Sequence, residues 1–143
     1  MRTVSLAGLI LMVAAIVGLL LTHALVSHSP VVIGVQVAAA ALVLWARVTF
    51  GRRSFHAAAN PTEGGLVTTG PYHYIRHPIY TGVCVFSWGG VLANLSVLSV
   101  ALGGLLVLGA VLRMLMEERL VAQRYPAYRQ YAQATKRMVP YVF

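Results

Sequence analysis

Four long apolar runs, at residues 4–21, 31–50, 79–95 and 97–116, constrain the fold of this chain more than any other feature. As an α-helix the first run would rise about 27 Å, close to the hydrocarbon thickness of a bilayer. Charged residues make up only 10% of the 143 residues, so polar groups could not cover the surface of a soluble globule. The sequence therefore predicts an all-α polytopic membrane protein with about four transmembrane helices.

The first run has a competing interpretation as a cleaved signal peptide, because Arg2 precedes it. The run is long for the apolar core of a signal peptide, and Ala24-Leu25-Val26 is a poor cleavage site. We therefore expect the run to be retained as the first transmembrane helix.

The third and fourth runs are separated only by a short polar break at residues 94–96, so they are expected to form an antiparallel hairpin. Gly89-Gly90 lie as far before this turn as Gly103-Gly104 lie after it, and Gly82 and Gly109 stand nearly opposite by the same count. Glycines that meet at one depth let two backbones approach closely. The spacing predicts a tightly packed, rigid hairpin.

The formal net charge of +8 is unevenly distributed along the chain. All eleven Lys and Arg residues lie at the N-terminus, around residues 47–77 or from Arg113 onward, and none lies near residues 28 or 95. By the positive-inside rule, both termini are expected on the cytoplasmic side, in a bacterial inner membrane. Orientation and affinity for membrane lipids explain the charge, and a nucleic-acid partner is not expected.

The polar tail is expected to leave the membrane after the fourth run. Pro126 should end the fourth helix. Tyr125, Tyr128 and Tyr131 recur every three residues and predict one helix face at the membrane interface. One membrane domain, residues 1–143, is expected to comprise two helices (1–50), a cytoplasmic connection (51–78), the hairpin (79–120) and the tail (121–143).

Residues 70–82, Gly-Pro-Tyr-His-Tyr-Ile-Arg-His-Pro-Ile-Tyr-Thr-Gly, form the most distinctive polar stretch. Its two X-Pro steps hold the backbone extended or turned. Glu117 and Glu118 stand at the other end of the hairpin, and a plain interpretation pairs Glu117 with Arg113 at a solvated helix end. Because the hairpin brings both polar clusters to the cytoplasmic face, we expect a site there.

Other kinds of site have less support. His73 and His77 have the spacing of two metal ligands on a helix, but Pro71 and Pro78 make a regular helix doubtful there, so no metal site is expected. The lone Cys84 excludes an internal disulfide and lies in an apolar run, where a thiol is a poor nucleophile. With no strand before a glycine-rich loop, a Rossmann-type nucleotide site is not expected.

Residues 66–72, Leu-Val-Thr-Thr-Gly-Pro-Tyr, and the Arg-His-Pro-Ile-Tyr-Thr-Gly stretch at 76–82 resemble the signature of the isoprenylcysteine carboxyl methyltransferase family. That family and the related phospholipid N-methyltransferases are integral membrane enzymes that use S-adenosylmethionine. Arg113-x3-Glu117-Glu118 is also similar, so the resemblance covers roughly residues 66–143. It implies methyl transfer to a lipophilic acceptor, such as an isoprenylcysteine-type carboxylate or a related lipid.

The resemblance also implies the functional residues. Arg113 matches a substrate-binding arginine and forms, with Glu117, the expected catalytic pair. The expected S-adenosylmethionine-binding residues are Leu66, Val67, Tyr72, Arg76, His77, Pro78, Ile79, Tyr80, Gly82, Glu117 and Glu118. Gly64-Gly65 stand where family members often carry a polar residue, so a side-chain contact of the family would be missing there.

The chemistry of S-adenosylmethionine agrees with these residue types. Arg76 or His77 could bind its carboxylate or an adenine edge, tyrosines could stack on the ring, and glutamates could hold the cationic part or the ribose hydroxyls. Methyl transfer mainly needs an aligned, desolvated acceptor, and an amine acceptor would first have to lose a proton. Arg113 favours an acceptor with an anionic head that enters laterally from the bilayer.

Two alternatives stay open. The end of the chain, Pro140-Tyr141-Val142-Phe143, is similar to that of sterol-reductase-type enzymes, which use NADPH, although residues 76–82 favour the methyltransferase. A non-catalytic membrane protein is the other alternative, and the intact Glu117-Glu118 pair counts against it. The sequence leaves open the acceptor, O- against N-methylation and the oligomeric state.

Overall fold

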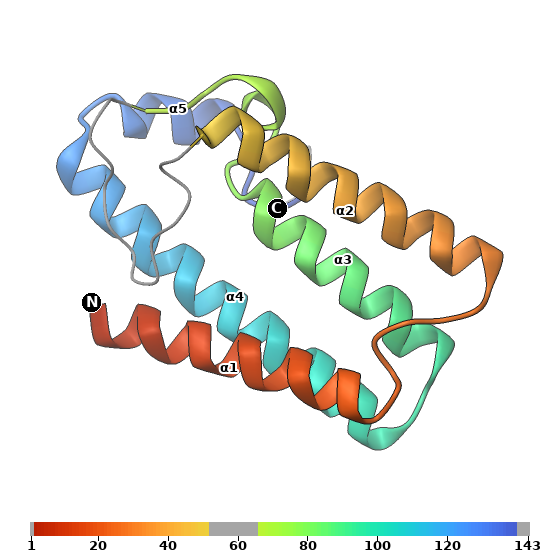
Figure 1. The fold of residues 1–143 in the computed structure, drawn as a ribbon. Helices are drawn as coiled ribbons and strands as arrows, with labels where there is room; N and C mark the ends of the chain where they lie inside the picture. The colour runs from red at the N-terminus through yellow and green to blue at the C-terminus, as the bar shows by residue number, and fades with distance from the viewer. Residues whose placement is uncertain (1, 52–65, 140–143) are drawn as a thin grey trace.

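The part of the chain that the structure describes folds into helices, with no strand. The structure is a computed structural model, and it describes residues 2–51 and 66–139. In chain order, its elements are α1 (Arg2–Leu21), α2 (Pro30–Phe50), the 3-10 turn η2 (Gly70–His73), α3 (Pro78–Ala93), α4 (Val97–Arg124) and α5 (Tyr128–Ala134) (Figure 1). The predicted all-α fold is confirmed.

Local sequence signals set the helix ends. Pro30 and Pro78 lie in the first turns of α2 and α3, where a missing backbone N–H does no harm. At the start of α4, the Ser99 N–H donates to the Ser96 hydroxyl at 3.0 Å and the Ser96 N–H donates to the Ser99 hydroxyl at 2.9 Å. The last helical residue of α4 is Arg124, two positions before Pro126, as predicted.

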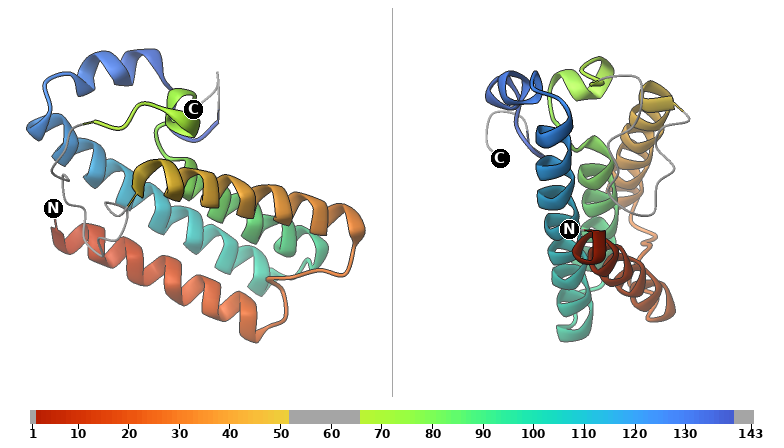
Figure 2. Two further views of the ribbon diagram at one scale, coloured as in Figure 1. Left: turned by 45° about the horizontal axis from the view of Figure 1, so that its top comes forward. Right: turned by 90° about the vertical axis from the view of Figure 1, so that its left-hand side faces the viewer.

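The long helices pack as two antiparallel pairs. α1 lies along α4 and α2 lies along α3, and these are the most extensive contacts of the bundle (Figures 1 and 2). The core between the pairs consists of Met12, Ala15, Cys84, Leu106 and Ala110. α3 and α4 are consecutive in the chain but contact each other much less.

The prediction that glycine pairs meet between the third and fourth helices is wrong. Gly90 packs against the backbone carbonyls of Ala24 and Leu25, in the connection between α1 and α2. Gly109 faces α1, where a Cβ would lie 2.6 Å from the carbonyl oxygen of Gly8. Equal distance from a turn fixes the depth of two residues but not the helix face on which they lie.

The other glycines expected to join the third and fourth helices face different neighbours. Gly82 packs against α2, since a Cβ there would lie 2.8 Å from the carbonyl oxygen of Ala39. Gly103 does face α3, beneath the ring of Trp88, whereas Gly104 faces open space. The close backbone contacts therefore join α3 to α2 and α4 to α1.

Gln36 joins the two helix pairs at the end of the bundle away from the termini. Gln36 is 4% exposed, and its Nε2 donates to the carbonyl of Leu25 at 2.8 Å and to that of Phe86 at 3.1 Å. A buried amide within an apolar span needs such partners. This one side chain ties α2, α3 and the connection after α1 together.

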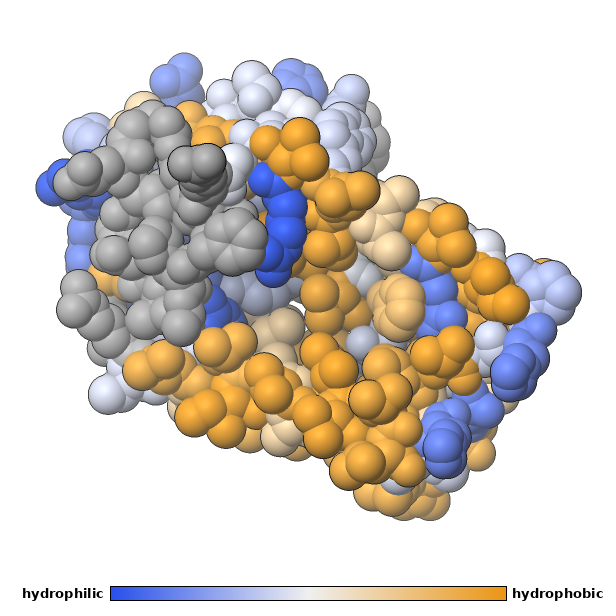
Figure 3. All heavy atoms as spheres, viewed as in Figure 1, coloured by the Kyte–Doolittle hydropathy of each residue, from blue (hydrophilic) through white to orange (hydrophobic). Residues whose placement is uncertain are grey.

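Among the helices of residues 2–51 and 66–139, three are long and apolar enough to cross a membrane, namely α1, α2 and α4. α3 is also apolar but has 16 residues, because Pro78 begins it and the break at Asn94 ends it. Large apolar side chains such as Ile10, Val31 and Val48 are exposed, and apolar atoms dominate the surface over α1 and α2 in Figure 3. The molecule therefore has the architecture of a polytopic membrane protein.

The glycine contacts generate a stability prediction. Gly90→Ala should lower the free energy of unfolding by about 1–3 kcal/mol, because its Cβ would collide with the carbonyls of Ala24 and Leu25. Gly104→Ala is the matched control and should be neutral or stabilising by up to about 1 kcal/mol, since its Cβ would enter open space and alanine favours the helix. The reaction of a thiol dye with the buried Cys84 during heating would report unfolding of the detergent-solubilised protein. Equal effects of the two substitutions would contradict this packing.

Candidate active site

Polar residues gather at the end of the bundle where α2 and α4 finish and α3 begins. η2 and α5 lie across this end in both views of Figure 2. The N–H of Arg76 donates to the carbonyl of Lys136 at 2.7 Å, and the N–H of His77 donates to that of Arg137 at 2.9 Å. Residues 128–139, which we call the C-terminal segment, therefore lie against the motif at residues 70–82.

Backbone constraints shape the motif before α3 begins. Gly70 has a φ of +57°, and a Cβ there would lie 2.6 Å from the Oγ1 of Thr49 in α2. Pro71 then occupies the first turn of η2, and the ring of Tyr72 packs on Phe50 with centroids 5.5 Å apart. The motif is thus fixed to the end of α2, with Tyr72 buried.

Glu118 is the centre of an ion cluster. Its carboxylate accepts a hydrogen bond from the Nε of Arg76 at 3.1 Å and one from the Nε of Arg137 at 3.1 Å, and it lies 3.1 Å from the Nε2 of His77. The Arg76 and His77 side chains are each 9% exposed and that of Glu118 is 13% exposed. Hydrogen bonds between charged groups are strong where water is largely excluded. The cluster connects the motif, α4 and the C-terminal segment.

Arg76 also holds the end of α5. Its Nη1 donates to the carbonyl of Ala132 at 2.8 Å and to that of Thr135. Carbonyls in the last turn of a helix have no N–H donor within the helix, and a cation there is favourable. The Nε and Nη1 donors of Arg76 are therefore engaged within the protein.

Glu117, Tyr80 and Arg113 form a ring of three hydrogen bonds. The Tyr80 hydroxyl donates to the Oε1 of Glu117 at 2.6 Å, and the Nη2 of Arg113 donates to the same oxygen at 3.1 Å. The Nε of Arg113 donates to the Tyr80 hydroxyl at 2.7 Å, which closes the ring. The pairing of Glu117 with Arg113, which the plain interpretation of this helix end gives, is present, and Tyr80 joins it. The ring holds the Glu117 carboxylate in one orientation while its side chain stays 26% exposed.

Arg113 lies deeper in the bundle than a lipid-facing arginine would. It is 6% exposed, and its Nη1 lies 3.5 Å from the carbonyl oxygen of Ser5 in α1. Gly8 makes room for it, since a Cβ at Gly8 would lie 3.0 Å from the Cγ of Arg113. α1 thus helps to direct this guanidinium toward Tyr80 and Glu117.

The tyrosines after Pro126 pack inward, so the prediction of an interfacial tyrosine face is wrong. Tyr128 is 7% exposed, and the Tyr131 hydroxyl donates to the carbonyl of Tyr72 at 2.6 Å. Burial raises the pKa of Tyr131 to about 12, against the opposing hydrogen bond with Thr135. Tyr131 is therefore a protonated donor at neutral pH. The threefold spacing misleads because Tyr125 caps α4 while α5 begins only at Tyr128.

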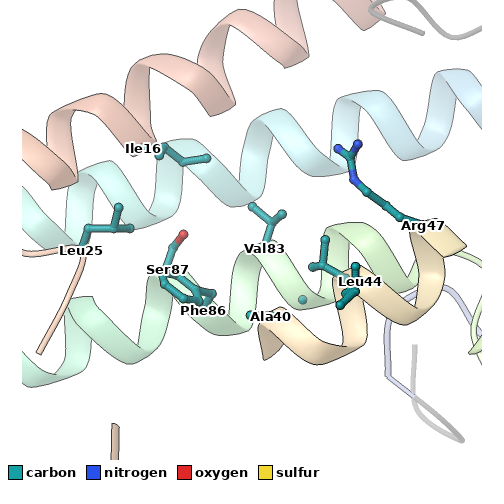
Figure 4. Close-up of a pocket in the computed structure, with 10 residues that line it drawn as sticks. Ile16, Leu25, Ala40, Leu44, Arg47, Val83, Phe86 and Ser87 are labelled. Atoms are coloured by element: carbon teal, nitrogen blue, oxygen red, sulfur yellow. The ribbon is translucent and has the colours of Figure 1, made fainter. Parts of the chain in front are cut away.

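An apolar cavity of 380 Å³ lies between α2, α3 and the second half of α1, within the usual range for small-molecule sites (Figure 4). Its lining residues are Ile16, Leu25, Ala40, Val43, Leu44, Arg47, Gly82, Val83, Phe86 and Ser87. Arg47 is the charged residue of this lining and lies at the end near η2. The sequence does not reveal the cavity, because three separate segments build it.

The structure brings most of the expected site residues together. Those joined by direct contacts are Arg76, His77, Tyr80, Arg113, Glu117 and Glu118. Tyr72 instead contacts Phe50 and Tyr131. Pro78 and Ile79 form the first turn of α3, Gly82 lines the cavity, and Leu66 and Val67 are half-buried before η2. Glu63, Gly64, Gly65 and Pro140 lie outside the described residues.

Two residues of the polar site are not among those expected from the sequence. Thr135 and Arg137 of the C-terminal segment contact Arg76 and Glu118, and only their place in a polar tail could have drawn attention to them. Within residues 2–51 and 66–139, no group of three His, Cys, Asp or Glu side chains could hold a metal ion.

Comparison with known proteins gives one relative and no solved structure. Over 80 residues the chain is 38% identical to the cobalt-zinc-cadmium resistance protein CzcN of Cupriavidus metallidurans, which covers 52% of this chain. The aligned part is 35% of that relative, so the chain spans about a third of its length. No solved structure matches.

A family model described as phospholipid methyltransferase matches residues 29–128. The match runs from the start of α2 to the start of α5 and so includes the polar ring, most of the cavity lining, and Arg76, His77 and Glu118 of the ion cluster, but not Arg137. It extends further toward the N-terminus than the resemblance at residues 66–143, because it includes the second helix. The chain belongs to the phospholipid methyltransferase family.

Proposed function

We propose that this integral membrane protein transfers a methyl group from S-adenosylmethionine to a lipophilic acceptor. One juxtaposition carries the proposal: the ring of Tyr80, Glu117 and Arg113 lies at the polar end of a bundle whose apolar cavity begins at Gly82, half a turn further along α3. A polar cofactor and an apolar acceptor could therefore meet near Tyr80. The family match supports methyl transfer as the reaction class.

The two glutamates support different roles toward the cofactor. Glu118 is 13% exposed and already accepts hydrogen bonds from two guanidinium groups, whereas the Glu117 side chain is 26% exposed. S-adenosylmethionine supplies a methyl group on a sulfonium cation, next to an ammonium group. We assign Glu117 to the cationic part or the ribose hydroxyls, with His77 and Tyr72 as the neighbouring ring contacts.

The acceptor would place its apolar part in the cavity and its reactive group near Tyr80. Arg47 lines the cavity, and Phe50, three residues later on α2, packs on Tyr72 of η2. The end of α2 therefore lies beside both the cavity and the polar site, which supports a meeting of acceptor and cofactor there. A chain could enter from the bilayer between α2 and the second half of α1, both of which line the cavity.

The hydrogen bonds of Glu117 favour an acceptor that is already ionised. Its Oε1 accepts from both Tyr80 and Arg113, so these two donors of the protein already occupy the lone pairs of this oxygen. An amine acceptor needs a base, whereas a carboxylate does not. We therefore favour a carboxylate-bearing lipid. Arg113, expected as a direct substrate ligand, is assigned to hold Tyr80 and Glu117 in place.

The proposal also covers the orientation of the protein in the membrane and the choice between methyl transfer and metal binding. Arg119, Arg124 and Arg129 are exposed at the polar end of the bundle, which supports a cytoplasmic position for that end in a bacterial inner membrane. The name of the relative refers to resistance to cobalt, zinc and cadmium. We propose methyl transfer rather than metal binding for this chain, because the family match includes its polar site.

Calorimetry tests the cofactor assignment. The detergent-solubilised protein should bind S-adenosylmethionine, and Glu117→Gln should weaken binding by about ten- to a hundredfold, since a hydrogen bond to a charged group contributes about 1.5–3 kcal/mol. His77→Ala should also weaken it. The control Arg119→Gln removes an exposed charge of the same end of α4 and should bind normally. Binding of NADPH instead would favour the reductase alternative.

Labelling tests the acceptor path. With bacterial membranes and a labelled methyl donor, the wild-type protein should transfer label to a lipid fraction. Ala40→Phe should fill part of the cavity and abolish most transfer while calorimetric binding of S-adenosylmethionine stays unchanged. The control Val37→Phe adds a ring to the same helix at a position that is 63% exposed and should transfer normally. Equal transfer by both variants would contradict the path.

A further inference from the structure

The C-terminal segment is held against the motif by contacts of several kinds. Two backbone hydrogen bonds join Arg76 and His77 to Lys136 and Arg137, and the Thr81 hydroxyl donates to the carbonyl of Met138 at 2.9 Å. The bond from Tyr131 to the backbone of Tyr72 and those from Arg76 to the end of α5 add to them. The segment thus forms one wall of the polar site.

His77 contacts Arg137 directly and also through Glu118. Its backbone N–H donates to the carbonyl of Arg137, and its ring nitrogen lies 3.1 Å from Glu118, which accepts in turn from the Arg137 guanidinium. The three residues therefore form a closed loop. Because both the backbone and the ring of His77 are fixed, Arg137 and Glu118 determine where this imidazole points.

The charges explain why the carboxylate is needed. Two guanidinium groups, those of Arg76 and Arg137, each lie 3.1 Å from Glu118, so they lie close to each other. Like charges repel strongly where water is largely excluded, and the carboxylate between them offsets this repulsion. Without its charge, Arg76 would repel Arg137 and with it the C-terminal segment.

We propose that Glu118 and Arg137 are positioning residues that hold the C-terminal segment against the motif and thereby orient His77 and Tyr72 for the cofactor. Glu118 thus acts through other residues, unlike the adjacent Glu117. The inference rests on the proposed function only in naming S-adenosylmethionine as the ligand; the attachment of the segment is independent of it.

A double-mutant cycle tests the proposal on the full-length protein by calorimetry with S-adenosylmethionine. Glu118→Gln should weaken binding at least tenfold, because two arginines are left to repel each other. Arg137→Gln should weaken it severalfold, and Arg137→Lys should recover most of that loss. Adding Arg137→Gln to Glu118→Gln should strengthen binding again, because it removes the repulsion. Arg129→Gln, an exposed charge on α5, is the control and should bind normally.

Methyl-transfer kinetics give a second readout. Arg137→Gln should raise the KM for S-adenosylmethionine severalfold and leave kcat nearly unchanged, since saturation restores the oriented site. A residue that merely stabilised the fold would not produce this division between KM and kcat. A lower kcat with an unchanged KM would overturn the positioning role.

Hydrogen exchange without any cofactor tests the attachment itself. In Glu118→Gln, amides in residues 72–81 and 128–139 should exchange faster, while those in α1 and the first half of α4 should keep wild-type rates. This result would stand even if the wild-type protein did not bind S-adenosylmethionine. A failure of the proposed function can therefore be distinguished from a failure of the positioning proposal. Unchanged exchange in residues 72–81, or additive losses of affinity in the double variant, would overturn the proposal. If Glu118→Gln unfolds throughout, equal affinity of Arg137→Gln and Arg129→Gln would overturn it.

Discussion

The attraction of one carboxylate for two arginines organises the polar end of this protein. Glu118 draws Arg76 from the motif and Arg137 from the C-terminal segment to the end of α4, so that three distant parts of the chain meet. Arg76 and Glu118, the two largely buried groups, would be costly to bury alone, and breaking a buried pair typically costs about 3–5 kcal/mol. The short α5 has few contacts with α4, so its position depends on these charges.

The sequence predicts the helices well because their signals are local. Apolar runs long enough for a bilayer, the prolines at positions 30, 78 and 126 and the Ser96 cap define the ends within a few residues. Helix pairing depends on which face of each helix turns inward, and spacing from a turn carries no such information. For this reason Gly90 and Gly109 contact the α1–α2 connection and α1 instead of meeting the glycines of each other's helix.

The candidate site also has a part that the sequence predicts and a part that it does not. The motif at residues 70–82 and the Arg113-to-Glu118 stretch can be singled out because they place rare polar residues beside apolar runs. The hydrogen bonds between these residues cannot be predicted from the sequence. Glu117 accepts a hydrogen bond from Tyr80, whereas Glu118, its direct neighbour, accepts from Arg76 and Arg137. Successive residues of a helix point about 100° apart, so two adjacent acids face different surroundings. Contacts between residues 59 positions apart, such as Tyr131 and Tyr72, have no local signal at all.

The hydrogen bonds of Gln36 have a consequence for the cavity between the helix pairs. Both of its acceptors are carbonyls of residues that line the cavity, Leu25 and Phe86, so this side chain links two of the cavity walls at the end away from η2. Arg47 marks the other end, eleven positions later on α2 (47 − 36 = 11), which corresponds to about 16 Å of helix. Under the proposed function, this span limits the length of acceptor that the cavity can enclose. The rest of a longer extended hydrocarbon chain would lie between α1 and α2 and reach the bilayer.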